Sequence, residues 1–203
     1  KKAGLEGFGK EGDYVARQIH RWTKQYQMSE TTKIPEMDKL IEWLPKNVPP
    51  GERTSVVHGD YRIDNMVLHP TEPKVIAVLD WELSTLGDPL ADFTYHLMGW
   101  EIPSSDPVRP AIAQIADKKA WGIPTRDEYV AKYCELTGRT GGIPDLNYYF
   151  AYNAFRLAGI LQGIVGRVRD GTASSAVAAQ NAERVVPLAQ FAYAAAQRAG
   201  MEG

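Results

Sequence analysis

The spacing of apolar residues predicts two helices near the start of the chain. Across residues 14–27 the apolar positions recur every three or four residues, which is typical of one face of a helix. These positions are Val15, Ile19, Trp22 and Tyr26. A second pattern of this kind covers residues 34–44, with Pro35 in its first turn, where proline is well tolerated. We therefore expect two amphipathic helices before residue 45.

The second half of the chain also favours helices. The stretch from Phe150 to Val165 is apolar on nearly every side, which predicts a buried central helix. A buried arginine usually has a carboxylate partner, so we expect Arg156 in this stretch to form an ion pair. Pro187 is expected to kink or split the last helix. The predicted helices cover residues 90–100, 111–121, 125–136, 145–168 and 174–198.

Between these regions lie three short stretches of strand pattern. Residues 55–57, 66–69 and 75–79 are rich in apolar and β-branched side chains, and residues 70–74 between the last two have the composition of a turn. Residues 66–79 therefore predict a β-hairpin, and no further strand is expected after Asp80. The fold class is α+β, a single domain over residues 1–203 that is mostly helical with one small antiparallel hairpin.

Composition and charge narrow the function classes. Hydrophobic residues make up 44% and charged residues 24% of the chain, as in ordinary globular proteins. The formal net charge of −2 argues against a nucleic-acid or polybasic membrane partner. The single cysteine, Cys134, rules out an intramolecular disulfide. Because no apolar run reaches the roughly 18 residues of a membrane span and residues 1–30 lack the apolar core of a signal peptide, we expect a cytoplasmic protein. The sequence does not predict the oligomeric state.

The hairpin register predicts a magnesium site. If residues 71–74 form the turn and Pro70 pairs with Val75, then Asn65 lies opposite Asp80. One amide oxygen and one carboxylate would then face the same point. Mg²⁺ prefers oxygen ligands and usually takes only one or two carboxylates, so Asn65 and Asp80 suit this ion. Asp60, in the loop before the hairpin, remains free to accept a proton from a hydroxyl nucleophile.

This arrangement resembles a known family. Residues 58–65 (HGDYRIDN), followed by a strand that ends in Asp80, are similar to the aminoglycoside phosphotransferases, whose fold is like that of protein kinases. The resemblance implies that Asp60 is the catalytic base, that Asn65 and Asp80 bind Mg²⁺ and through it the ATP phosphates, and that His58 shapes the loop. ATP would then donate its γ-phosphoryl group to a hydroxyl of a small molecule.

Three further segments indicate one branch of that family. Residues 13–27, 87–92 (GDPLAD) and 155–163 (FRLAGILQG) are similar to the kinase domains associated with acyl-CoA dehydrogenases, so the resemblance spans almost the whole chain. It suggests a hydroxyacyl acceptor. Aminoglycosides, choline-like alcohols and amino alcohols remain open as alternatives.

The resemblance also implies that part of the kinase is not in this chain. A kinase-like enzyme needs an N-terminal lobe that cradles ATP and supplies a phosphate-binding lysine. Only 57 residues precede His58, and their pattern predicts a loop and helices. We therefore expect the chain to be the C-terminal lobe, with its catalytic segment over residues 55–92, and we expect this piece alone to be inactive.

Other polar residues of the segment have two interpretations each. Arg62 and Asp64 could bind substrate or pair with each other. Glu82 shares a face with Asp80 on an extended chain, so it could contact metal or substrate, or cap residues 84–86. The two acidic residues at the start of the helix near residue 90 are expected to be structural, because carboxylates there cap free N–H groups. These two are Asp88 and Asp92, and Asp92 could also tie the helix to the catalytic loop.

Two other functions are compatible with these features. A lobe without its ATP cradle could be a non-catalytic binding or regulatory module, although such a module would not need Asp60, Asn65 and Asp80 together. A Mg²⁺-dependent hydrolase would need another carboxylate, which Glu82 could supply. Residues 7–12 match G-x-G-x-x-G, but no strand precedes them, so we interpret them as a loop.

Overall fold

The computed structural model describes all residues except 1–3, 5–6, 51–52, 105–110 and 173–174. It is mostly helical with two small antiparallel sheets, which confirms the predicted mixture of elements. The α-helices are α1 (Tyr14–Ser29), α2 (Pro35–Trp43), α3 (Pro89–Leu97), α4 (Arg126–Thr137), α5 (Leu146–Arg169) and α6 (Ser175–Arg198). The strands are β1 (Ser55–Val57), β2 (Met66–Leu68), β3 (Val75–Val78) and β4 (Thr85–Gly87). Short 3-10 turns are η1 (Leu44–Lys46), η2 (Ile63–Asn65), η3 (Trp81–Leu83), η4 (Met98–Trp100) and η5 (Ile112–Gln114).

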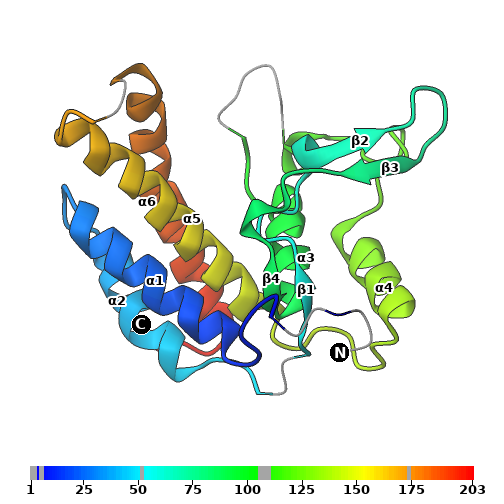
Figure 1. Cartoon of the computed structure of the whole chain (residues 1–203), viewed down its shortest axis with the longest axis horizontal. Helices are drawn as coiled ribbons and strands as arrows, with labels where there is room; N and C mark the ends of the chain where they lie inside the picture. Colours follow the sequence, from blue (N-terminus) through cyan, green and yellow to red (C-terminus); the bar gives the residue numbers. More distant parts are fainter. Residues whose placement is uncertain (1–3, 5–6, 51–52, 105–110, 173–174) are drawn as a thin grey trace.

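The molecule has two halves (Figure 1). One half is a layer of long helices, in which α5 packs against both α1 and α6, and α2 packs against α6. The other half holds α3, α4 and the strands. Helix α5 is the buried central helix that its apolar pattern predicts, and Phe150, Tyr152 and Phe155 are at most 1% exposed. Because α3 also packs against α5, the same core joins the two halves.

The first sheet pairs two segments that are far apart in the chain. Strand β1 runs antiparallel to β4, with Val57 opposite Thr85. The expectation that no strand follows Asp80 is therefore wrong. Strand β4 is too short to show a period of two, and it exists because β1 supplies its hydrogen-bond partners. This pairing fixes both ends of the segment between β1 and β4, which holds Asp60, Asn65 and Asp80.

The second sheet is the predicted hairpin, but its register differs from the expected one by two residues next to the turn and by one residue beyond the irregularity. Met66 pairs with Val78 and Leu68 pairs with Val75, with an irregularity between Val67 and Leu68. In line with this register, the carbonyl of Asn65 accepts the N–H of Leu79 at 2.8 Å, so Asn65 does not lie directly opposite Asp80. The shift begins at the turn, where the N–H of His69 donates to the carbonyl oxygen of Lys74 at 2.8 Å, and the irregularity, which leaves Ile76 unpaired, reduces the shift by one residue.

Two helix expectations also need correction. Residues 111–121 form the short 3-10 turn η5 and a hydrogen-bonded turn that begins at Lys118, and not an α-helix. At η5 the Gln114 side chain accepts the N–H groups of Ser104 and Ala111. Helix α6 continues through Pro187, so the last helix is not split. By contrast, α4 begins at the expected cap, where Thr125 and Glu128 bind each other's backbone N–H groups.

The buried face of α5 predicts a large stability effect. Replacing Phe155, which is fully buried, with alanine should lower the free energy of unfolding by about 3–5 kcal/mol, because the mutation leaves a cavity. Met28 on α1 is 71% exposed, so Met28→Ala should change stability by about 0.5 kcal/mol or less. Urea unfolding followed by circular dichroism measures both. Equal effects of the two mutations would contradict this assignment of the core.

Candidate active site

Helix α3 holds the loop after β1 through hydrogen bonds to its Asp92 side chain. Asp92 on α3 accepts hydrogen bonds from the backbone N–H groups of His58 and Gly59, the latter at 2.9 Å. Gly59 has φ of +87°, and a Cβ atom there would lie 2.9 Å from the carbonyl oxygen of Leu83, so the position requires glycine. Asp92 therefore ties α3 to the loop after β1, which is one of the roles that the sequence suggested. Burial raises the pKa of the Asp92 carboxyl, and the two N–H donors act in the opposite direction.

His58 links this loop to the end of the hairpin. The ring is 3% exposed, with Nε2 2.7 Å from the carbonyl oxygen of Leu79. Its Nδ1 accepts the N–H of Asp60 at 3.2 Å, so the ring proton is on Nε2 and Nε2 donates to Leu79. The Trp81 ring lies 4.8 Å from the His58 ring, centroid to centroid. Both ring nitrogens are thus engaged in shaping the loop, which is the role implied by the resemblance.

Asp60 and Asn65 are brought together by the η2 turn. The Asn65 side-chain amide donates to the carbonyl oxygen of Asp60 at 2.9 Å and to its carboxylate Oδ2 at 3.1 Å. Because Nδ2 makes both contacts, the amide oxygen of Asn65 is directed away from Asp60. Asp60 remains partly accessible to solvent. The pair therefore offers one carboxylate and one amide oxygen toward the outside of the loop.

Asp80 lies at the end of β3 and has a strained backbone. Its φ of +65° is in the left-handed region, which is rare for residues other than glycine and is often found at functional sites. The side chain is exposed, and no hydrogen bond from the described residues reaches its carboxylate. Asp80 directly follows Leu79, the hydrogen-bond partner of Asn65, so the two predicted metal ligands remain neighbours despite the shifted register.

These oxygen atoms fit the requirements of Mg²⁺, which takes one or two protein carboxylates and completes its shell with water and phosphate oxygens. In the described part of the chain, no three His, Cys, Asp or Glu side chains gather to form a metal site by themselves. A site built from Asn65 and Asp80 would therefore bind the ion together with a phosphate ligand. Their role as metal ligands stays a prediction.

Of the remaining candidate residues, one is buried and structural, and three lie at the surface. Asp88 is structural, since it caps α3 by accepting the N–H of Leu90 at 3.0 Å and also accepts the hydroxyl of Tyr149. Arg62 and Asp64 pair with each other at the surface, with Nε 2.9 Å from Oδ2. Glu82 is exposed in η3.

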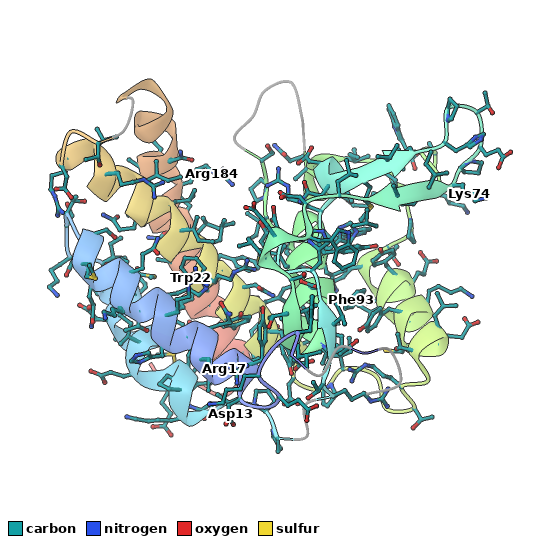
Figure 2. All side chains as sticks on the ribbon, viewed as in Figure 1. Asp13, Arg17, Trp22, Lys74, Phe93 and Arg184 are labelled. Atoms are coloured by element: carbon teal, nitrogen blue, oxygen red, sulfur yellow. The ribbon has the colours of Figure 1, made fainter. Side chains whose placement is uncertain are left out.

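An apolar pocket of 440 Å³ lies beside the catalytic loop, between α3 and α4. Its aromatic lining comes from Tyr61, Trp81, Phe93, His96, Tyr129 and Tyr133. Phe93 points from α3 toward α4 (Figure 2) and stacks on Tyr133 with ring centroids 3.7 Å apart. The sequence did not indicate this pocket, because its lining comes from separate segments between residues 56 and 137 and only tertiary packing brings them together.

Arg156 also contacts the loop after β1, and the sequence did not predict its hydrogen-bond partner correctly. Its guanidinium group donates to the carbonyl oxygen of Gly59 and not to the expected carboxylate. The ion pair expected for Arg156 is therefore not found among the described residues.

The fold and this loop are like those of kinase-like phosphotransferases. The crystal structure of a "putative aminoglycoside phosphotransferase" from Ralstonia eutropha JMP134 matches with a TM-score of 0.90 and 51% identity, covering 98% of this chain and 60% of that chain. The model of the phosphotransferase enzyme family matches residues 1–129. The chain belongs to this phosphotransferase family, which confirms the resemblance seen in the sequence.

Curated relatives place the same segment inside longer proteins. Mouse acyl-CoA dehydrogenase family member 10 is 46% identical over 196 residues, which cover 97% of this chain and 18% of that protein. Human acyl-CoA dehydrogenase family member 11 is 41% identical over 187 residues, covering 92% of this chain and 24% of that protein. The chain thus spans about a fifth to a quarter of these relatives. Within the described residues, no helix is both long and apolar enough to cross a membrane.

Burial of His96 predicts a pH-dependent stability. The ring packs against Tyr61, Trp100 and Tyr129, and burial lowers its pKa below the ordinary value of 6.5. As the pH falls below about 6.5, the unfolded chain takes up a proton that the folded ring resists, so stability falls. In His96→Leu the unfolding free energy should depend less on pH between about 6.5 and 5. Urea titrations at several pH values measure this slope, and an unchanged slope would contradict the assignment.

Proposed function

We propose that this chain supplies the catalytic loop of an ATP- and Mg²⁺-dependent phosphotransferase that moves the γ-phosphoryl group to a hydroxyl of a small molecule. The observation that carries the proposal is the joined pair of Asp60 and Asn65 on a loop clamped by Asp92, with Asp80 at the adjacent strand end. A base and two oxygen ligands in this arrangement are what phosphoryl transfer requires.

Each residue then has a distinct task. Asp60 orients the acceptor hydroxyl and takes its proton, while the hydroxyl oxygen bonds to the γ-phosphorus and the bond to the bridging oxygen of ADP breaks. Asn65 holds the Asp60 carboxylate in place through its amide N–H group. Asn65 and Asp80 would hold Mg²⁺, which supplies neutralisation of the phosphate charge. His58, with both ring nitrogens engaged, shapes the loop and transfers no proton.

The acceptor is proposed to carry an apolar portion. The pocket beside the catalytic loop has a mainly aromatic lining, with Lys132 as the cation among its residues. Such a lining suits a hydroxyacyl compound better than a polycationic aminoglycoside. The link of several relatives to acyl-CoA dehydrogenases by name agrees with this choice. An aminoglycoside-like alcohol is the alternative acceptor, and both classes belong in the same assay.

We further propose that these residues form the C-terminal lobe and that a separate lobe completes the ATP site. The residues before β1 form α1, α2 and η1, and none of them is a described strand. The hairpin and η3 also leave large apolar side chains exposed, as expected of a surface covered in the complete enzyme. These are Leu68, Val75, Ile76, Leu79, Trp81 and Leu83. The alternative, a non-catalytic binding module, rests on the same helical N-terminal segment.

Replacing the proposed base gives the first test. In the full-length protein with both lobes, Asp60→Asn should lower kcat for phosphoryl transfer by about 100-fold or more, because the amide cannot accept the proton. Transfer from radiolabelled ATP to hydroxyacyl and aminoglycoside acceptors measures it. Asp38→Asn, on the exposed face of α2, serves as the matched control and should keep normal activity. Equal activity of wild type and Asp60→Asn would reject the catalytic role, and an inactive wild type would favour the binding module.

The metal ligands can be tested apart from turnover. Asp80→Asn in the full-length protein should weaken Mg²⁺ binding in the presence of a non-hydrolysable ATP analogue by about tenfold or more, because one charged contact is lost. Isothermal titration measures the affinity. The exposed Asp117→Asn, which changes the same charge in a distant loop, is the control. Unaltered Mg²⁺ affinity in Asp80→Asn would show that the metal is held elsewhere.

A further inference from the structure

Arg156 is a buried cation with an unusual set of contacts. It lies on α5 and is 8% exposed, and its guanidinium carbon is 5.9 Å from the ring centroid of Trp22 and 5.2 Å from that of Tyr95. Figure 2 shows Trp22 on α1, lying against α5. The Nε atom of Arg156 is buried and has no hydrogen-bond partner among the described residues. Burying a charge is costly unless it is paired, so a purely space-filling role explains this residue poorly.

Among the described residues, the guanidinium group makes one hydrogen bond, and it goes to the loop after β1. Nη2 of Arg156 donates to the carbonyl oxygen of Gly59. That carbonyl belongs to the peptide group between Gly59 and Asp60, and the N–H of the same peptide group donates to Nδ1 of His58. Arg156 and His58 therefore hold the two polar ends of a single peptide plane.

This plane sets the direction of the Asp60 side chain. A peptide group is rigid, so fixing its oxygen and its N–H leaves only rotation about the N–Cα bond of the next residue. The opposite side of Gly59 is held by Asp92, which accepts its N–H at 2.9 Å. Gly59 has a left-handed backbone and no Cβ to restrict its φ and ψ angles. The hydrogen bonds to Asp92, His58 and Arg156 therefore fix its backbone conformation.

We infer that Arg156 is a positioning residue for phosphoryl transfer, which fixes the peptide plane before Asp60 so that its carboxylate faces the acceptor hydroxyl. This role rests on the proposed function. The guanidinium group is planar by itself, and the two aromatic rings lie within cation–π distance of it, so that this attraction offsets part of the cost of its burial. Arg156 does not contact the reacting atoms. Its effect is exerted through the backbone of Gly59.

Two substitutions separate positioning from packing. Arg156→Met keeps most of the side-chain length but loses the charge and every donor. Arg156→Lys keeps the charge and one type of donor but loses the planar group that lies near both aromatic rings. Arg167→Met, eleven residues further along α5 and exposed, is the matched control for loss of an arginine from the same helix.

The first readout does not depend on activity. Hydrogen exchange of the Asp60 amide in the full-length protein reports the peptide plane directly, and it should speed up by about tenfold or more in Arg156→Met. Amides of the β2–β3 hairpin and of α5 should exchange as in the wild type. Equal loss of protection throughout α5 would show that Arg156 only stabilises the packing, and would overturn the proposal.

The second readout is the kinetic effect. Arg156→Met should lower kcat by about 100-fold, as expected of a misplaced catalytic group, while KM for MgATP changes less than about threefold. Arg156→Lys should be intermediate, and Arg167→Met should match the wild type. A normal kcat in Arg156→Met, or a loss explained by a lower folded fraction, would overturn the proposal. If the wild type itself transfers no phosphate, the proposed function fails, and the exchange data still decide whether Arg156 orders the loop.

Discussion

The candidate site depends first on the carboxylate of Asp92, which accepts two backbone N–H groups from the turn after β1. A loop with a left-handed glycine has few contacts of its own, and exposed N–H groups would leave it free to adopt other conformations. The carboxylate replaces those missing partners with charge-assisted hydrogen bonds, which are stronger than neutral ones. Because Asp92 lies on α3 and α3 packs on α5, the loop is anchored to the helical core.

Further contacts extend this clamp to the residues that would do chemistry. His58 joins the loop to the end of β3, Asn65 joins it to Asp60, and Arg156 joins it to α5. Each bond is modest alone, but together they connect the predicted base and the predicted metal ligands through rigid elements. Preorganised groups of this kind need little rearrangement when a substrate binds, which is the main contribution of a protein to phosphoryl transfer.

The polar site and the apolar surfaces around it differ in their structural role. The buried network around Gly59 fixes geometry, whereas the pocket between α3 and α4 and the exposed side chains of the hairpin offer contact area. With a partly exposed polar loop beside apolar surface, the proposed enzyme could bind its substrates largely through contacts away from the reacting atoms. The solved relative, of which this chain covers 60%, shows that the same fold also occurs in a longer protein.

The sequence alone determined the six α-helices that the structure describes, the hairpin and the spacing of Asp60, Asn65 and Asp80, because these follow from local periodicity and from a short motif within one segment, but it also predicted a helix over residues 111–121 that does not form. It missed β4, since a three-residue strand has no pattern until β1 pairs with it. It misplaced the hairpin register, since composition shows neither which residues close the turn nor where a strand carries an unpaired residue. Only the tertiary structure decided the partner of Arg156 and the aromatic pocket, because both arise where segments distant in the chain pack together. The buried guanidinium group of Arg156 donates to the acceptor that this packing places beside it, which is the carbonyl oxygen of Gly59.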